Sequence, residues 1–177
     1  MKKIIYITLF LNLLIAQDHW ETAIFASDEW EYVVPSEEPL SNWNELNFED
    51  GMWMSSQGGF GYADGDDGTI IGPAISVYFR KIFNVLDKNK LSCAILSADY
   101  DDGYIAYLNG VEFSRRNMGS VGDEVSYNQN ATDLHEAELY QGVFPESVEI
   151  NLEEHSLNIG NNTIAIEVHN FGSNSSD

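Results

Sequence analysis

The sequence is poor in cysteine and in basic residues, and each shortage excludes a class of protein. Cys93 is the only cysteine among 177 residues, so no disulfide within the chain can stabilise the fold. Only 8 lysines and arginines stand against 29 aspartates and glutamates, and the formal net charge is −21. A polyanion such as DNA, RNA or an anionic bilayer would be repelled by this charge. We therefore expect no nucleic-acid partner.

Motifs of common hydrolases are also missing. The sequence contains no H-E-x-x-H zinc motif and no G-x-S-x-G nucleophile elbow. Cys93 lies in the hydrophobic run LSCAIL, which is typical of a small buried side chain rather than of a nucleophile. No histidine has a second ligand at metal spacing; the four are His19, His135, His155 and His169. We therefore predict that the chain is not an enzyme.

The apolar run at the N-terminus is too short to cross a bilayer. Lys2 and Lys3 precede an apolar stretch from Ile4 to Ala16, and this is the arrangement of a secretory signal peptide. We assign residues 1–17 to a signal peptide, without a cysteine directly after it that could carry a bacterial lipid anchor. The mature chain is then a secreted or cell-surface protein with no membrane span. Removal of the two lysines makes it more acidic still.

Short runs rich in β-branched and aromatic residues follow, and Gly, Asn and Asp separate them. Many short strands at this spacing predict an all-β fold, a sandwich or a barrel. Helical spacing of apolar residues occurs after the leader only briefly, over residues 133–139. The strand-like runs cover residues 77–85, 90–98, 104–113, 147–152 and 162–170.

The stretch DYDDGYIAYLNG combines an acidic cluster with two turn signals. Asn109-Gly110 lies between two strand-like runs, and both residues tolerate the positive φ of a type I′ turn, so a β-hairpin is predicted. Asp102-Gly103 suits a turn in which the carboxylate accepts backbone amide hydrogen bonds. The turn does not require Asp99 and Asp101. Their carboxylates would repel each other unless they are solvated, protonated, paired with a cationic side chain or bound to a metal. Exposure to solvent is the commonest solution.

Three polar side chains, those of Arg80, Glu167 and His169, fall within predicted strands. A buried guanidinium without a partner is costly, so we expect Arg80 to pair with a carboxylate such as Glu167. Strand alternation places Glu167 and His169 on one face and Ile166 on the other. We therefore interpret His169 as a structural or surface histidine.

Several motifs together resemble a known family. They are DDGYIAYLNGVEF, then Arg115 and Asn117-Met118, then LNIGNNTIAIEVHN and the terminal SSD, with GYADGDDGTI and VYFRKIF upstream. This combination is similar to the galactose-binding-like jelly-roll module of secreted bacterial proteins. The LNG hairpin and the LNIGNNTIAIEV run also resemble the sugar-binding jelly roll of large glycosidases. The resemblance covers roughly residues 43–177, and Gly119 stands where the family commonly has proline.

The resemblance implies a jelly-roll β-sandwich over residues 18–177. In this family the module occurs beside spore-coat-type kinases, lamin-tail-like domains and metallophosphoesterases. The resemblance therefore implies an accessory domain of a multidomain protein rather than a complete protein. The family normally continues past SSD into one more strand. We therefore expect an N-terminal fragment of a longer protein, with a missing last strand, an exposed sheet edge and a downstream domain.

Three carboxylates lie in the glycine-rich loop DGDDG. Hard oxygen ligands on a flexible backbone suit calcium, although Gly68 and Thr69 occupy positions that exclude an EF-hand. Calcium-stabilised loops are common in galactose-binding-like folds, so by analogy Asp64, Asp66 and Asp67 are candidate ligands of a structural calcium. The alternative is a solvated acidic turn.

Sugar recognition needs aromatic faces that stack on a pyranose and polar groups that hold its hydroxyls. Side chains of both kinds occur in or beside the predicted loops. Packing between the sheets is the alternative role of each aromatic ring. The candidate ligand-binding residues are Trp53, Tyr62, Tyr104, Arg115 and Asn117.

Two functions from different classes fit the sequence. The first is a non-catalytic accessory module that binds a carbohydrate or an extracellular matrix glycan and tethers an attached domain to it. The second is a structural or protein-interaction module attached to a secreted enzyme such as a metallophosphoesterase, with no sugar pocket. Retardation of the protein by polysaccharides distinguishes the two.

Overall fold

The computed structural model describes residues 19–62 and 67–172, and these form an all-β protein. Within these ranges the only helical segments are the short 3-10 turns η1 (Lys88–Lys90) and η2 (Leu139–Gln141). The predicted signal peptide lies outside the described residues. The strands are β1 (Glu29–Val33), β2 (Met54–Gln57), β3 (Phe60–Gly61), β4 (Thr69–Ile70), β5 (Ser76–Val85), β6 (Ala94–Ala98), β7 (Gly103–Leu108), β8 (Val111–Arg116), β9 (Glu146–Ile150) and β10 (Gly160–His169). The all-β prediction is confirmed.

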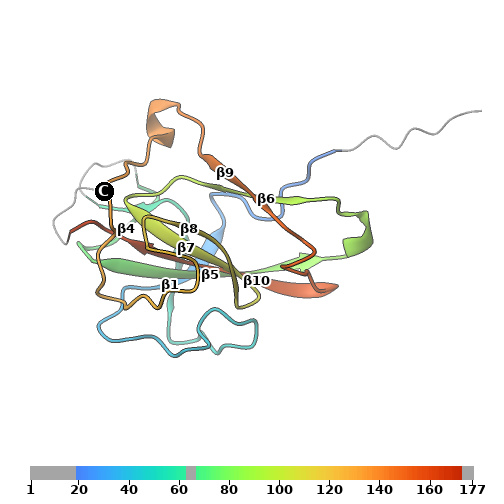
Figure 1. The fold of residues 1–177 in the computed structure, drawn as a ribbon, viewed down its shortest axis with the longest axis horizontal. Helices are drawn as coiled ribbons and strands as arrows, with labels where there is room; N and C mark the ends of the chain where they lie inside the picture. Colours follow the sequence, from blue (N-terminus) through green and yellow to red (C-terminus); the bar gives the residue numbers. More distant parts are fainter. Residues whose placement is uncertain (1–18, 63–66, 173–177) are drawn as a thin grey trace, which may run out of the picture.

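One antiparallel sheet of six strands carries the fold (Figure 1). Its strand order is β2-β1-β5-β10-β7-β8, and the long strands β5 and β10 pair over their full ten residues at its centre. Two smaller sheets accompany it: β6 pairs antiparallel with β9, and β3 pairs parallel with β4. The chain therefore places its last described strand in the middle of the main sheet.

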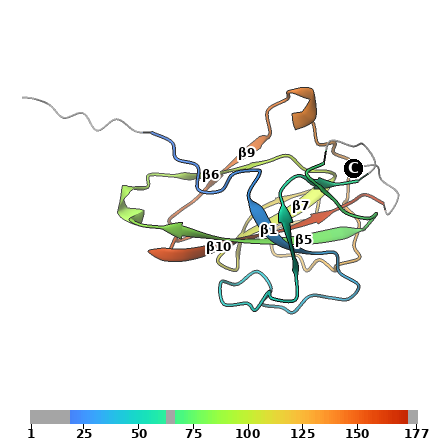
Figure 2. The ribbon, with the colours of Figure 1, turned by 180° about the vertical axis from the view of Figure 1, so that it is seen from behind.

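The β6–β9 pair covers one face of the main sheet, as seen from both sides (Figure 1, Figure 2). Tyr104 and Ala106 of β7 point to this face, and Leu96 of β6 packs against them. Leu108 meets Ile150 of β9 in the neighbouring cluster. Apolar burial between two β layers is the defining feature of a sandwich. We refer to this side as the strand-covered face.

Irregular segments cover the opposite side, which we call the loop-covered face. The connection between β1 and β2 places Trp43 against Tyr78 and Ala165, and the Trp43 and Tyr78 ring centroids lie 4.7 Å apart at 79°. The connection after β8 inserts Met118, which is 0% exposed, against Ile105. Large side chains from these loops therefore do the packing that a second full sheet would otherwise provide.

The predicted hairpin is present. β7 and β8 pair antiparallel through Asn109 and Gly110, whose φ angles are 51° and 86°. Both values lie in the left-handed region that a type I′ turn requires. The Asn109 side chain also accepts the backbone amide of Thr163 at 2.9 Å, which fixes the hairpin to β10.

The Asp102 carboxylate of the acidic cluster is fully buried and joins three segments. It is 0% exposed and accepts hydrogen bonds from the backbone amides of His135 at 3.0 Å and Phe171 at 2.6 Å. Asp102 therefore accepts amides, as predicted, but from segments far away in the sequence. Such donors replace the hydrogen bonds to water that a carboxylate loses on burial.

Asp99 has a second structural role. It is exposed, as expected, and it also accepts the backbone amides of Glu138 and Leu139 at 3.0 and 2.9 Å. These amides belong to the start of η2, where helical N–H groups have no partner within the helix. The brief helix expected over residues 133–139 is wrong. In this region only the turn η2 is helical, because side chains of the acidic cluster bind the backbone amides that a longer helix would use.

We predict that Asp102→Asn lowers the free energy of unfolding by about 2 kcal/mol. The asparagine NH₂ group would replace one of the two oxygens that accept the backbone amides of His135 and Phe171, and one amide would lose its acceptor. Chemical denaturation at neutral pH measures the change. Asp133→Asn is the matched control, since exposed Asp133 bonds only the adjacent Leu134 amide. Equal stability of the two variants would contradict a central role for Asp102.

Candidate functional site

A groove of about 330 Å³ opens where the loop-covered face reaches the β2 end of the sheet. Its floor contains one cross-strand row, because Glu31 of β1 stands directly opposite Ser55 of β2 and Arg80 of β5. Directly opposite residues on neighbouring strands share a face, so these three side chains lie side by side. Asp50, from the connection between β1 and β2, forms the wall.

Arg80 anchors that wall from below. It is 1% exposed, its Nη1 donates to Asp50 at 2.8 Å, and its Nη2 donates to the backbone oxygen of Glu45 at 2.8 Å. The guanidinium also lies 4.9 Å from the ring centroid of Phe48. Burial lowers the pKa of Arg80, and the negative charges of Asp50 and Glu31 oppose this effect. Nε is buried without a hydrogen-bond partner.

The predicted carboxylate partner of Arg80 is present, but its predicted identity is wrong. Arg80 stands opposite Ala165 on β10, whereas Glu167 stands opposite Tyr78 and bonds elsewhere. Asp50 reaches Arg80 because the loop before β2 folds over the sheet. A partner from a loop thirty residues away cannot be recognised from strand alternation.

The acidic side chains of the groove are not all neutralised. Lys81 donates to the backbone oxygen of Glu29 at 2.7 Å and lies 3.7 Å from the carboxylate of Asp28. The carboxylates of Glu29 and Glu31 make no hydrogen bond or ion pair with the described residues. Two acceptor groups at the groove are therefore available to a ligand that carries hydroxyl or amine donors.

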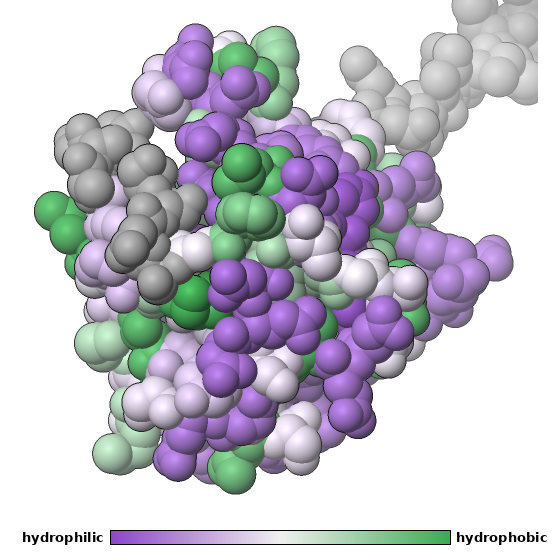
Figure 3. All heavy atoms as spheres, turned by 60° about the vertical axis from the view of Figure 1, so that its left-hand side comes forward, coloured by the Kyte–Doolittle hydropathy of each residue, from purple (hydrophilic) through white to green (hydrophobic). Residues whose placement is uncertain are grey.

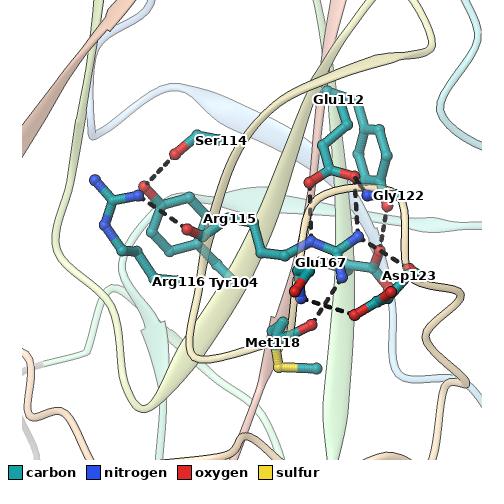
Figure 4. Close-up of polar contacts among 11 residues, drawn as sticks. Tyr104, Glu112, Ser114, Arg115, Arg116, Met118, Gly122, Asp123 and Glu167 are labelled. Atoms are coloured by element: carbon teal, nitrogen blue, oxygen red, sulfur yellow. Dashed lines mark hydrogen bonds and ion pairs between the residues drawn. The ribbon is translucent and has the colours of Figure 1, made fainter.

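A second polar cluster fastens the loop after β8 (Figure 4). Arg115 is 9% exposed and forms two hydrogen bonds to the Glu112 carboxylate, at 2.8 and 2.9 Å. It also donates to the backbone oxygens of Met118 at 2.7 Å and Asp123 at 3.0 Å. The hydrogen bond to Glu112 raises the pKa of Arg115. Every terminal nitrogen of this guanidinium is thus engaged within the protein.

Glu167 and His169 form a buried pair on the loop-covered face. The Glu167 carboxylate accepts the Tyr107 hydroxyl at 2.5 Å and lies 3.2 Å from Nε2 of His169. Nδ1 of His169 lies 2.8 Å from the backbone oxygen of Gln129. Both ring nitrogens face oxygen atoms of the protein, so the histidine has partners on each side within the fold. With exposures of 0% and 4%, His169 and Glu167 are structural, as interpreted for His169.

Of the sequence-predicted ligand residues, Trp53 lies beside the groove. Its amide donates to the backbone oxygen of Asp50 at 2.7 Å, and its partly buried ring stacks on Trp43 at 6.2 Å. Tyr62 and Tyr104 belong to the core, with exposures of 8% and 1%. The Tyr104 ring has no open face, because it lies between the sheet and β6.

Arg115, near the end of β8, and Asn117, directly after that strand, both hold the fold together. Asn117 adopts a φ of 52° and donates to the backbone oxygen of Asp102 at 2.7 Å. Ligand binding by the five predicted residues stays a prediction. The groove residues Glu31, Asp50 and Ser55 were missed. The strand that carries Ser55 is MSSQ and has no β-branched or aromatic residue, and Asp50 reaches the groove only through the fold of its loop.

The proposed calcium loop is described only in part. Asp64 and Asp66 lie outside the described residues, and the carboxylate of Asp67 lies so close to Gly61 that a Cβ there would overlap it. Among the residues that the structure describes, no three His, Cys, Asp or Glu side chains are grouped to hold a metal ion. In the same part of the chain, no helix is long and apolar enough to cross a bilayer. Calcium binding stays a prediction.

Comparison with known proteins shows the fold. No protein-family model and no curated protein matches the sequence. A β-glucuronidase from glycoside hydrolase family 2 superposes with a TM-score of 0.50 and 18% identity, over 81% of this chain and 13% of that chain. A Bacteroides uniformis β-glucuronidase gives a TM-score of 0.50 and 15% identity, over 81% of this chain and 14% of that chain. This chain thus has the fold of a small part of these enzymes.

We predict that the protein loses stability steeply as the pH rises above about 10. Burial raises the pKa of Tyr78, Tyr100, Tyr104 and Tyr107 above their ordinary value of 10.0. Unfolded tyrosines then release protons that the folded protein retains, so alkali favours the unfolded state. Denaturant titrations between about pH 8 and pH 12 measure the slope.

Tyr104→Phe removes one of these four groups and should flatten the alkaline slope, while costing about 1 kcal/mol at pH 8 through the lost hydrogen bond to Ser114. Tyr140→Phe is the control, because the Tyr140 side chain is 66% exposed. A slope unchanged by Tyr104→Phe would contradict this explanation.

Proposed function

We propose that this chain is a non-catalytic accessory module of a secreted protein and that it binds a carbohydrate in the groove between β1, β2 and β5. The structural likeness to a small part of two β-glucuronidases supports an accessory rather than a catalytic role. The observation that carries the proposal is the row of Ser55, Glu31 and Arg80 beneath the Asp50 wall.

The groove has the size and chemistry for a sugar. Ligand pockets begin at about 300 Å³, and this groove has about 330 Å³. Carboxylates accept two hydrogen bonds side by side, which suits the neighbouring hydroxyls of a pyranose. Arg80 holds Asp50 rigidly, so one wall of the site is ordered before a ligand arrives.

The charge of the groove favours a neutral glycan. Arg80 and Lys81 are already engaged with Asp50 and with the Asp28–Glu29 segment, whereas Glu29 and Glu31 keep their negative charges unpaired. A uronic acid or a sulfated sugar would be repelled by these carboxylates and by the net charge of −21. Hydroxyl groups of a neutral sugar can donate to them.

Affinity electrophoresis through gels that contain neutral or acidic polysaccharides tests the proposal. We expect a neutral polysaccharide to retard the protein and Glu31→Gln to weaken that binding at least about tenfold, because a hydrogen bond to a charged acceptor is lost. Glu153→Gln is the matched control, since it changes the net charge equally at an exposed position. Equal retardation of both variants would show that the groove is not the binding site. Unshifted migration in every gel would contradict carbohydrate binding itself.

The second candidate, a structural or protein-interaction module attached to a secreted enzyme, is favoured by one observation. An uncharged, strongly exposed apolar segment follows η2, and Phe144 in it is 94% exposed. Large exposed apolar side chains in a group mark interaction surfaces. Migration unaffected by any polysaccharide would favour this candidate.

We also propose that calcium stabilises the loop containing Asp64, Asp66 and Asp67, on the sequence pattern alone. Thermal unfolding in calcium should then have a higher midpoint than unfolding in a chelator, because a ligand of the folded state stabilises it. Asp66→Asn should reduce the difference between the two midpoints. Identical midpoints for the unmodified protein in calcium and in chelator would contradict calcium binding.

A further inference from the structure

The segment from η2 to β9 forms an apolar projection, which we call the knob (residues 139–144). It stands out at the top of the molecule, where apolar atoms lie on its surface (Figure 3). Leu139, Tyr140, Val143 and Phe144 are 51%, 66%, 44% and 94% exposed. No residue of the knob is charged, although the chain as a whole is strongly acidic. Exposed apolar groups of this size are characteristic of interaction sites.

Backbone hydrogen bonds and one carboxylate hold the knob in shape. Asp99 accepts the amides of Glu138 and Leu139 at 3.0 and 2.9 Å. Gly142 ends η2 at a φ of 81°, and its amide donates to the Leu139 oxygen at 2.9 Å. The Val143 amide returns to the Glu138 oxygen at 3.3 Å. A preorganised projection loses little conformational entropy when it binds.

Acidic residues surround the knob on its N-terminal side. Glu136 and Glu138 are exposed, and neither side chain forms an ion pair with the described residues. A matching partner surface therefore combines an apolar recess with a positive charge at its rim. Few surfaces of this protein could supply that charge.

A small groove on a different side of the molecule has both properties. It lies beside η1 and has a volume of about 200 Å³; its lining combines the leucines Leu91, Leu152 and Leu157 with the polar residues Lys88, Asn89 and Ser156. This volume is below the ~300 Å³ at which small-molecule pockets begin, so the groove suits a single inserted side chain. In Figure 1 and Figure 2, η2 projects at the top of the molecule and η1 lies at one end of its long axis, so the two are well separated.

Lys88 is unusual among the described cationic side chains because it has no ion pair. Four others contact carboxylates directly: Arg80, Lys81, Arg115 and Arg116. Lys90, two residues further on, lies 3.9 Å from Asp87. The rim of the leucine groove thus carries an uncommitted positive charge in a chain with only 8 basic residues.

We propose that the knob of one molecule docks into the leucine groove of a second copy, with Phe144 inserted among the leucines and Glu138 facing Lys88. The apolar knob with an acidic rim complements the apolar groove with a basic rim. The two surfaces differ and lie on different sides of the molecule, well separated from each other, so the proposed contact is heterologous and adds further copies rather than closing as a two-fold dimer.

The net charge of −21 opposes this association, so it depends on ionic strength. At physiological salt the Debye length is about 8 Å, which screens repulsion between distant charges but leaves the apolar contact intact. We therefore expect self-association that is weak at low salt and stronger near about 150 mM salt. This dependence is opposite to that of an interface held by charge alone.

Sedimentation velocity over a range of protein concentrations tests the proposal. The unmodified protein should form concentration-dependent species larger than a monomer, whereas Phe144→Ser and Lys88→Glu should each weaken association at least about tenfold. Met52→Ser and Lys90→Glu are the matched controls: Met52 is 95% exposed elsewhere, and Lys90 lies in the same turn but does not line the groove. Thermal midpoints verify that all four variants fold.

A mixture of the two defective variants gives the decisive result. Phe144→Ser retains an intact groove, and Lys88→Glu retains an intact knob, so an equimolar mixture should form dimers and nothing larger. A monomeric unmodified protein up to about 1 mM would overturn the proposal. So would a mixture that remains monomeric, or controls that are as defective as the variants. Glu31→Gln should associate normally, so this outcome is independent of sugar binding.

Discussion

The buried Asp102 carboxylate is the interaction on which the rest of the structure depends. It lies where β7 begins and accepts amides from the segment at His135 and from Phe171, directly after β10. It thereby ties the centre of the sheet to the irregular connection between β8 and β9. Because this domain has no disulfide and covers one sheet face with loops, such charge-assisted bonds replace the cross-links and strands that it lacks.

Local patterns predicted local structure correctly. Asn109-Gly110 predicted the hairpin because its two backbone conformations are determined by two adjacent residues, and the alternation in β10 placed Glu167 beside His169 because strand faces have a period of two. The short strands β1 and β2 were not predicted: β1 has only five residues, and β2, MSSQ, has no β-branched or aromatic residue. The candidate groove was not predicted either. Its floor depends on the pairing of three strands, and its wall depends on a loop that brings Asp50 to Arg80.

Basic residues are few, and most of them have structural roles. Arg80 holds the loop before β2, Arg115 holds the loop after β8, and Arg116 contacts Glu146 at 2.5 Å. The surplus of carboxylates therefore remains on the surface. Two surfaces differ from each other in this distribution. The groove between β1, β2 and β5 offers carboxylate acceptors to hydroxyl donors, and the apolar knob has acidic neighbours that complement Lys88. At the polar groove, Glu29 and Glu31 have no ion-pair partner among the described residues. The proposed partner of the knob is Lys88, the described lysine without an ion pair.

The position of β10 has a consequence for how the protein is made. This strand lies between β5 and β7, so those two strands cannot acquire their central neighbour until the chain has emerged from the ribosome beyond His169. An incomplete nascent chain exposes two unsatisfied strand edges, and its pairing is long-range and slow. The main sheet is therefore completed only after almost all of the described chain has been synthesised.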